Sequence, residues 1–330
     1  MRTNLSSQIS LNHVSPRYYK PENAVERSVL TRLEKIPTDI FETIEEGVRH
    51  IADEVAAKIQ ERQREGKFCT LAIGTGTSLR PLFTELVRRH KDEGLSFRNV
   101  VVFNLYEFYP LTEGNGSTFG QLNSLFLSQT DIDRQNVFTI DGSIPQNAIS
   151  EHCRLYEQRI QTFGGIDIVL MGIGREGNIG MNEPGSHASS PTRLILLDAT
   201  SRSEAARNWG VDNLPPCSIT MGVQTILSAR KIYLLTWGED KADIIQKAVE
   251  ENVNDTLPAS FLQLHNNVNV CIDLAAASHL TRIQRPWLVT SCEWNDKLIR
   301  SAIVWLCTLL NKPILKLTNK DYNENGLSKR

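Results

Sequence analysis

Short apolar segments alternate along this chain with longer stretches of helical periodicity. Helical patterns cover about 79–92, 117–129, 145–163 and 240–251, and the apolar segments are residues 68–73, 99–104, 166–174, 194–198, 231–237 and 268–273. The apolar segments lack a period of two, which is typical of strands that are buried on both faces. Strands that alternate with helices are joined by right-handed crossovers. The pattern therefore predicts an α/β fold, namely a Rossmann-like, doubly wound and mainly parallel sheet.

The length of the chain favours one large domain with appendages. A chain of 330 residues with 40% apolar side chains can bury one large core but hardly two of ordinary size. We expect an N-terminal arm over residues 1–36, a main domain over 37–284 and a C-terminal extension over 285–330, whose continuation into a further domain stays open. The first long helix should begin at Thr38. An amphipathic helix over about 295–310 has an apolar side that can pack on the core or on a partner, and we expect the core.

The charge balance excludes some classes of partner. Lys and Arg number 36 against 38 Asp and Glu, so the formal net charge is −2 and no global field recruits nucleic acid or an anionic membrane. No window approaches the roughly 18 consecutive apolar residues that a membrane span needs. The six cysteines are scattered without a C-x-x-C pair, which indicates reduced thiols rather than a zinc site or disulfides. We expect a cytoplasmic protein.

A glycine-rich turn follows the first buried segment of the main domain. Its small residues, Gly74, Thr75, Gly76, Thr77 and Ser78, open a predicted helix. Small side chains let the backbone approach an anion, and a helix N-terminus offers free N–H groups and a partial positive charge. The turn lacks the lysine of a P-loop and the third glycine of a dinucleotide fingerprint, so ATP and NAD are disfavoured. The alternative is a tight turn that binds nothing.

Two further polar segments follow predicted strands. The glycine-rich segment 172–185 carries Glu176, Asn178 and Glu183, and an aromatic patch with Tyr106 and Glu107 follows the segment 99–104. Carboxylates and amides bind hydroxyl groups, and a carboxylate can act as a base, so the first segment suits a polyhydroxylated ligand. Ligands of such sheets bind beyond the carboxyl ends of the strands. A structural loop and rim packing are the alternatives.

In order and spacing, these segments resemble the glucosamine-6-phosphate deaminase/isomerase family over about residues 65–283. The matching positions are residues 74–78, 103–104, 172–174, 182–184, 192–193, 218–223 and 262–265, with Glu107, Gly177, Ile179, Arg202, Gly238 and Lys241. The resemblance implies an amino-sugar 6-phosphate as the ligand and no metal or redox cofactor. It also implies that the phosphate is held by the loop from Thr75 to Ser78, by Arg207 and by Lys241.

The resemblance fails at the positions that transfer protons. The family reaction converts glucosamine 6-phosphate and water to fructose 6-phosphate and ammonia. Where the family has an aspartate base this chain has Tyr106, and where it has a histidine this chain has Asn178, preceded by Glu176 in place of an aspartate. The family's glutamate is kept as Glu183. A phenol has an unperturbed pKa of about 10, and an amide cannot shuttle protons. Tyr106 therefore either donates a hydrogen bond or acts as a base with a lowered pKa.

Three functions are compatible with the sequence. The first is an active deaminase or aldose–ketose isomerase of amino-sugar catabolism that divides the proton transfers among Glu176, Glu183, Glu107 and Tyr106. The second is a sugar-phosphate sensor or regulatory protein without turnover. The third is a hydrolase like 6-phosphogluconolactonase, which the Asn-Glu-Pro string at 182–184 disfavours. Family members include monomers and hexamers, so a homo-oligomer stays open.

Overall fold

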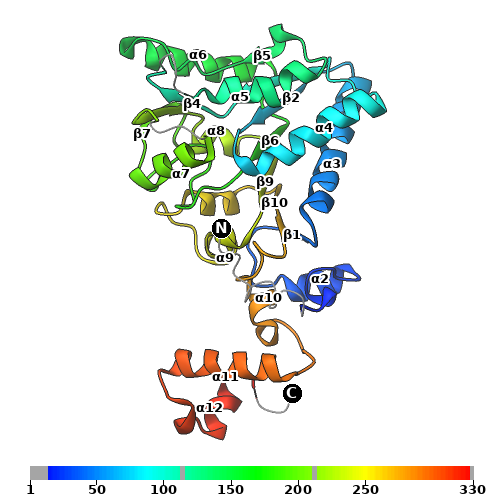
Figure 1. Ribbon diagram of the computed structural model, residues 1–330, viewed down its shortest axis with the longest axis vertical. Coiled ribbons are helices and arrows are strands. Elements are labelled where there is room, and N and C mark those ends of the chain that lie inside the picture. Colours follow the sequence, from blue (N-terminus) through cyan, green and yellow to red (C-terminus); the bar gives the residue numbers. More distant parts are fainter. Residues whose placement is uncertain (1–13, 112–115, 210–213, 328–330) are drawn as a thin grey trace.

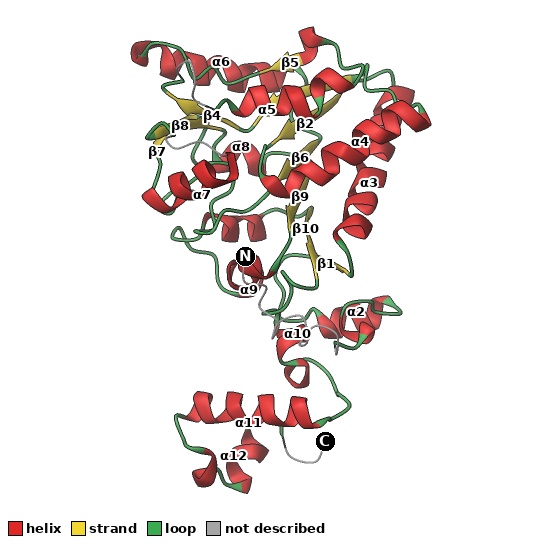
Figure 2. Cartoon of the chain, viewed as in Figure 1, coloured by secondary structure: helices red, strands yellow, loops and turns green. Residues whose placement is uncertain are grey.

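A seven-stranded parallel sheet forms the centre of the protein (Figures 1 and 2). Its order is β1-β10-β9-β6-β2-β3-β5, and every neighbouring pair is parallel. The computed structural model describes residues 14–111, 116–209 and 214–327. The strands are β1 (Thr38–Phe41), β2 (Cys69–Ile73), β3 (Val100–Asn104), β5 (Val137–Phe138), β6 (Ile168–Met171), β9 (Lys231–Thr236) and β10 (Val268–Asp273). The predicted fold class is confirmed.

Helices cover both faces of this sheet. One face is covered by α3 (Ile44–Arg64), α4 (Arg80–Glu93) and α5 (Thr118–Leu125), and the other by α6 (Ile149–Thr162), α8 (Val223–Leu227) and α9 (Ala242–Glu250). Consecutive strand residues belong to opposite cores: Leu71 packs in the first and Ala72 in the second. Both neighbours are fully buried, which explains why the strands show no period of two.

The strand order reverses at β2. After β2 the chain adds β3 on one side of it and later returns to add β6 on the other side. The backbone N–H of Gly74, just past β2, donates to the carbonyl of Leu170 in β6 at 2.9 Å. A crevice opens beyond the carboxyl ends of strands at such a switch point. Both glycine-rich segments begin there.

The predicted start of the first long helix is wrong. Residues Thr38–Phe41 form β1, which pairs with β10, and α3 begins only at Ile44. Thr43 is the N-cap of α3, and its Oγ1 accepts a hydrogen bond from the N–H of Glu46 at 3.1 Å. The short β1 segment has the composition of a helix start, but the unpaired edge of β10 pairs with it instead.

A second, antiparallel sheet stands beside the first. It contains β4 (Tyr106–Tyr109), β8 (Cys217–Thr220) and β7 (Arg193–Leu196) in the order β4-β8-β7. The strand expected over 194–198 exists, but its place in the parallel sheet was wrongly predicted. Leu196 is 71% exposed, so its apolar composition indicated a strand without indicating which sheet it joins.

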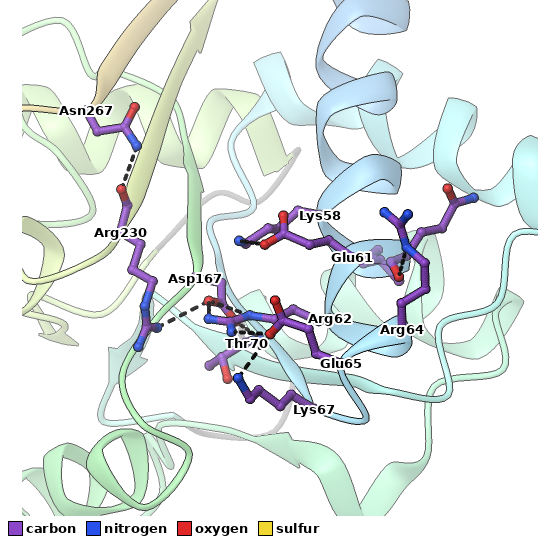
Figure 3. A network of polar contacts seen from close by, with 12 residues as sticks. Lys58, Glu61, Arg62, Arg64, Glu65, Lys67, Thr70, Asp167, Arg230 and Asn267 are labelled. Atoms are coloured by element: carbon purple, nitrogen blue, oxygen red, sulfur yellow. Dashed lines mark hydrogen bonds and ion pairs between the residues drawn. The ribbon is translucent and has the colours of Figure 1, made fainter.

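A buried carboxylate fastens α3 to the amino-terminal edge of the parallel sheet (Figure 3). Asp167, just before β6, is 2% exposed. It accepts hydrogen bonds from Arg62 of α3, from Arg230 at 3.2 Å and from the N–H of Thr70 in β2 at 3.0 Å. Both oxygens of the carboxylate are used, so this group of charges is structural. We call these four residues the Asp167 cluster.

The described part of the N-terminal arm packs on the main domain. It contains α2 (Ala24–Leu30), while the predicted arm residues 1–13 lie outside the described residues. Glu34 and Arg282 of α10 (Thr281–Gln284) are both buried, with Nε and Oε1 2.8 Å apart. The N–H is not directed at the oxygen, so the contact is electrostatic. Arg282 Nη2 also donates to the carbonyl of Thr38 at 2.8 Å. The arm is thus joined to α10 of the main domain.

The C-terminal extension lies at one end of the molecule, beyond α10 (Figure 1). It contains α11 (Asp296–Leu310) and α12 (Asn319–Glu324). Ala302 and Leu306 of α11 are buried, whereas Ile299, Val304 and Leu309 are exposed. The prediction that this apolar side packs on the core is therefore wrong for those three residues.

Candidate active site

A cavity of about 350 Å³ opens at the carboxyl ends of β2 and β6. The turn after β2 and the glycine-rich loop after β6 form two of its walls, and Tyr106 at the start of β4 contributes to a third. The remaining walls are one side of α7 (Ala199–Trp209) and the short helix η6 (Glu239–Lys241). The cavity therefore lies where the reversal of strand order predicted a ligand site.

The turn after β2 presents a helix N-terminus to the cavity. Gly76, Thr77 and Ser78 line it, and Thr77 and Ser78 begin the short helix η2 (Thr77–Leu79), which leads directly into α4. The positive end of a helix favours an anion. Thr75 was also predicted to bind phosphate, but its side chain is buried and Oγ1 donates to Tyr106 Oη at 3.4 Å. That hydroxyl is therefore directed at Tyr106 rather than lining the cavity.

The cations lie on other walls of the cavity. Lys241 and Arg207, both predicted from the resemblance, line the cavity. Arg175 in the loop after β6 lines it too and was missed by the sequence analysis, as was Glu204, whose Oε1 lies 2.8 Å from Lys241 Nζ. Helical spacing could have found Glu204, because it stands three residues before Arg207 on the same face of α7. The anion-binding end thus contains three cations and two carboxylates, Glu204 and Asp240, the second of which lies 3.8 Å from Arg175 Nη2.

Tyr106 faces the cavity from the start of β4, as expected. Burial raises the pKa of its phenol, and the hydrogen bond from Thr75 opposes this only in part. A phenol with a raised pKa is protonated at neutral pH. The raised pKa favours the hypothesis that the Tyr106 hydroxyl donates a hydrogen bond over the hypothesis that it is a base with a lowered pKa.

Two buried side chains at the cavity have oxygens without a hydrogen-bond partner in the described structure. Asn178 Oδ1 is one of them, and Asn178 lines the cavity. Glu183 is 5% exposed; its Oε2 accepts from Ser201 Oγ at 2.9 Å, while Oε1 is unpaired. Burial raises the pKa of Glu183, and the Ser201 hydrogen bond opposes that rise. Buried polar atoms are nearly always paired, so the unpaired oxygen of Asn178, which lines the cavity, is a candidate ligand contact, while Glu183 reaches the cavity only through Ser201.

None of the three predicted carboxylates, Glu183, Glu107 and Glu176, lines the cavity itself. Glu107 is buried, and its carboxylate accepts hydrogen bonds at the N-terminus of α5 from the N–H of Thr118, from the N–H of Phe119 and from Ser117 Oγ. Both of its oxygens are used, so the prediction of a catalytic role is wrong and Glu107 anchors α5 instead. Glu176 is exposed on the loop after β6, and its charge contributes to the raised pKa of Glu183.

The described residues include no group of three or more His, Cys, Asp or Glu side chains placed to hold a metal ion. None of the helices within the described ranges is both long and apolar enough to cross a membrane. The polar groups of the cavity are cations, amides, hydroxyls and the carboxylates of Glu204 and Asp240. The cations, amides and hydroxyls suit an anionic ligand with hydroxyl groups.

The switch-point cavity and its cationic end define a class, the Rossmann-like proteins that hold a small anionic ligand. Residues 42–271 match the family described as glucosamine-6-phosphate isomerases/6-phosphogluconolactonase. This chain belongs to that family, which confirms the resemblance seen in the sequence. A solved structure of a monomeric glucosamine-6-phosphate deaminase superposes with a TM-score of 0.70 at 35% identity, covering 74% of this chain and 100% of the other.

Two relatives show how far the likeness extends along the chain. Glucosamine-6-phosphate deaminase 1 of Bacillus subtilis is 36% identical over 228 residues, which are 68% of this chain and 93% of that protein. A glucosamine-6-phosphate deaminase-like protein of Bacteroides thetaiotaomicron is 65% identical over 330 residues, which are 99% of this chain and 50% of that protein. The chain therefore spans half the length of the second relative, and the C-terminal extension is shared with it.

Proposed function

We propose that the cavity binds glucosamine 6-phosphate and that the chain converts it, with water, to fructose 6-phosphate and ammonia. The observation that supports this best is Glu183, the glutamate kept from the family pattern, which is buried, accepts a hydrogen bond from Ser201 of the cavity wall and has one oxygen unpaired. The likeness to deaminases at 35–36% identity favours this reaction over lactone hydrolysis. In this proposal the protein acts in amino-sugar catabolism in the cytoplasm, within a main domain over 37–284.

The phosphate fits the cationic end of the cavity. The turn at Gly76, Thr77 and Ser78 would supply backbone donors, and Arg207 and Lys241 would supply charge-assisted hydrogen bonds. Each such bond contributes about 1.5–3 kcal/mol. Anchoring at the phosphate would leave the sugar ring between Tyr106 and the loop after β6, next to the unpaired oxygen of Asn178.

Glu183 would then transfer the protons. A carboxyl whose pKa is raised toward neutrality serves better as both acid and base at physiological pH than an ordinary one. Ser201 lines the cavity and holds Glu183 Oε2 at 2.9 Å, so this hydroxyl lies between the carboxylate and the ligand space. The protonated phenol of Tyr106 would donate a hydrogen bond to the sugar. With no ionised base at that position, turnover should be slow.

The second candidate is binding without turnover, as a sensor or regulatory protein. Tyr106 and Asn178 occupy the two family positions that transfer protons, and the pKa of Tyr106 is raised rather than lowered. Glu107 is also unavailable because it anchors α5. The phosphate-binding groups, by contrast, are present in the cavity wall. This division between binding and proton transfer is what a ligand sensor needs.

One pair of measurements separates the two candidates. The purified chain is incubated with glucosamine 6-phosphate, and ammonia and fructose 6-phosphate are measured while calorimetry gives the affinity. The proposed reaction predicts both products in equal amounts and their loss in Glu183→Gln at unchanged affinity. Binding without either product would establish the sensor instead. Absence of binding would reject both.

A further inference from the structure

Glu204 lies in the part of the cavity that the proposed function assigns to the phosphate. Its Oε1 is 2.8 Å from Lys241 Nζ, and the side chains of Glu204 and Lys241 are only 17% and 11% exposed. Both residues line the cavity. The ammonium group that should bind the ligand's anion is therefore already paired with a carboxylate of the protein.

The same carboxylate connects three walls of the cavity. Glu204 belongs to α7, Lys241 to η6, and the second oxygen of Glu204 accepts a hydrogen bond from the backbone N–H of Arg175 at 3.1 Å. Arg175 belongs to the loop after β6, and its Nε lies 3.8 Å from Glu204 Oε1. Each contact from Glu204 ends on a group that an anion could also use.

A phosphate ester and Glu204 cannot both pair with Lys241 at short range. Both are anions, and like charges repel strongly in a partly desolvated cavity. A phosphate that binds Lys241 must therefore displace the carboxylate. An uncharged sugar cannot displace the carboxylate, because it has no negative charge to replace that of Glu204 beside Lys241.

We propose that Glu204 is an internal occupant of the anion subsite, so that ligands bind only if their anionic group replaces it on Lys241. The inference rests on the proposed function and adds to it. Glu204 lowers the affinity of the cavity for every anion. As a result, only a ligand with a strongly charged group, such as a dianionic phosphate, binds. Glu204 is thus a specificity-determining residue that acts through Lys241.

The test is a double-mutant cycle read by calorimetry. Inorganic phosphate and glucosamine 6-phosphate are titrated into the wild type, Glu204→Gln, Lys241→Met and the double variant. Glutamine keeps an oxygen that can accept from the Arg175 N–H but loses the charge. Glu204→Gln should bind both ligands about tenfold more tightly, and Lys241→Met should weaken both. In the Lys241→Met background, Glu204→Gln should change either affinity by less than about threefold.

Glu239→Gln is the matched control. Glu239 is exposed, stands two residues before Lys241 and borders a different hollow, so the same loss of charge there should leave the affinities unchanged. A general electrostatic effect would instead increase affinity in both variants, which overturns the inference. Thermal melts of the ligand-free variants establish that each is folded.

The outcomes distinguish this inference from the function on which it rests. If the wild type binds phosphate through Lys241 but Glu204→Gln binds equally or more weakly, the inference is wrong and the proposed function stands. If Glu204→Gln gains affinity equally with and without Lys241, Glu204 does not act through that residue, and the inference is wrong. If no variant binds either ligand, both are wrong.

Discussion

Buried polar groups at the two ends of the parallel strands differ in how completely they are hydrogen-bonded. At the amino ends, both oxygens of Asp167 are engaged by Arg62, Arg230 and Thr70. At the carboxyl ends, oxygens of Asn178 and Glu183 lack hydrogen-bond partners among the described residues. Unpaired buried groups cost stability, so a fold tolerates them where a ligand will pair with them. The contrast separates polar groups that stabilise the fold from polar groups that have an unpaired oxygen for a ligand.

Removing Asp167 tests the structural side of this contrast and should have the largest effect. Asp167→Ala leaves Arg62 and Arg230 beside an empty, buried position, and breaking a buried pair in this way costs about 3–5 kcal/mol. Denaturant unfolding should show that loss of stability. Asp53→Asn is the control, since Asp53 is 69% exposed in its pair with Arg89 and should cost under about 1 kcal/mol. Equal losses in the two variants would contradict a special role for the Asp167 cluster.

Restoring the family's proton-transfer groups should give the next largest change. Tyr106→Asp combined with Asn178→His places an ionised carboxylate and an imidazole at the cavity, so ammonia release should rise up to about a hundredfold. The single change Tyr106→Phe should cost less than about tenfold in turnover, because the phenol only donates a hydrogen bond. Complete loss of turnover in Tyr106→Phe would show that the phenol is the base after all. Steady-state ammonia assays distinguish these results.

Truncating the cavity cations should affect binding and leave the fold intact. Arg207→Ala or Lys241→Ala should weaken glucosamine 6-phosphate binding about ten- to a hundredfold, which corresponds to the loss of one charge-assisted hydrogen bond. Calorimetry measures the affinity, and unfolding curves should stay close to those of the wild type. Lys247→Ala removes an exposed lysine paired with Asp243 and should alter neither. Unchanged affinity in both cavity variants would remove the phosphate assignment.

Glu183→Gln, which should abolish turnover, should have only a small effect on stability, and that effect should depend on pH. The folded state holds the proton of Glu183 more tightly than the unfolded state, because burial raises its pKa. The buried charge therefore destabilises the protein as the pH rises above the ordinary value of about 4.3. Glutamine removes this cost, so the variant should be more stable than the wild type at neutral pH and no more stable below that value.

Unfolding curves across this pH range test the prediction. Glu176→Gln is the control, because Glu176 is exposed and should show no such dependence. If Glu183→Gln is more stable than the wild type by the same amount at low pH, the ionisation of Glu183 does not cause the increase in stability. In that case Glu183 would be a structural group like Asp167, whose two oxygens are both hydrogen-bonded, and would not be available to a ligand.

Local patterns were enough to predict the sheet and the place of its cavity. Continuous apolar segments such as 68–73 require burial on both faces of a sheet. The glycines that follow them lie at the carboxyl ends of strands, however those strands pair with their neighbours. These properties depend on neighbours in sequence, so they can be read directly. The family resemblance located Lys241, Arg207 and Glu183 by the same kind of local spacing.

The partners of individual charges depended on contacts between distant segments. Glu107 and the segment 117–119 are about ten residues apart, and nothing in their spacing showed that the carboxylate would anchor α5 instead of facing a ligand. Glu204 meets Lys241 across a separation of 37 residues, and β7 joins β8 rather than the parallel sheet. A pattern of side chains gives the type and direction of an element. Which elements meet, and hence which charges are neutralised, follows only from how they pack together in three dimensions.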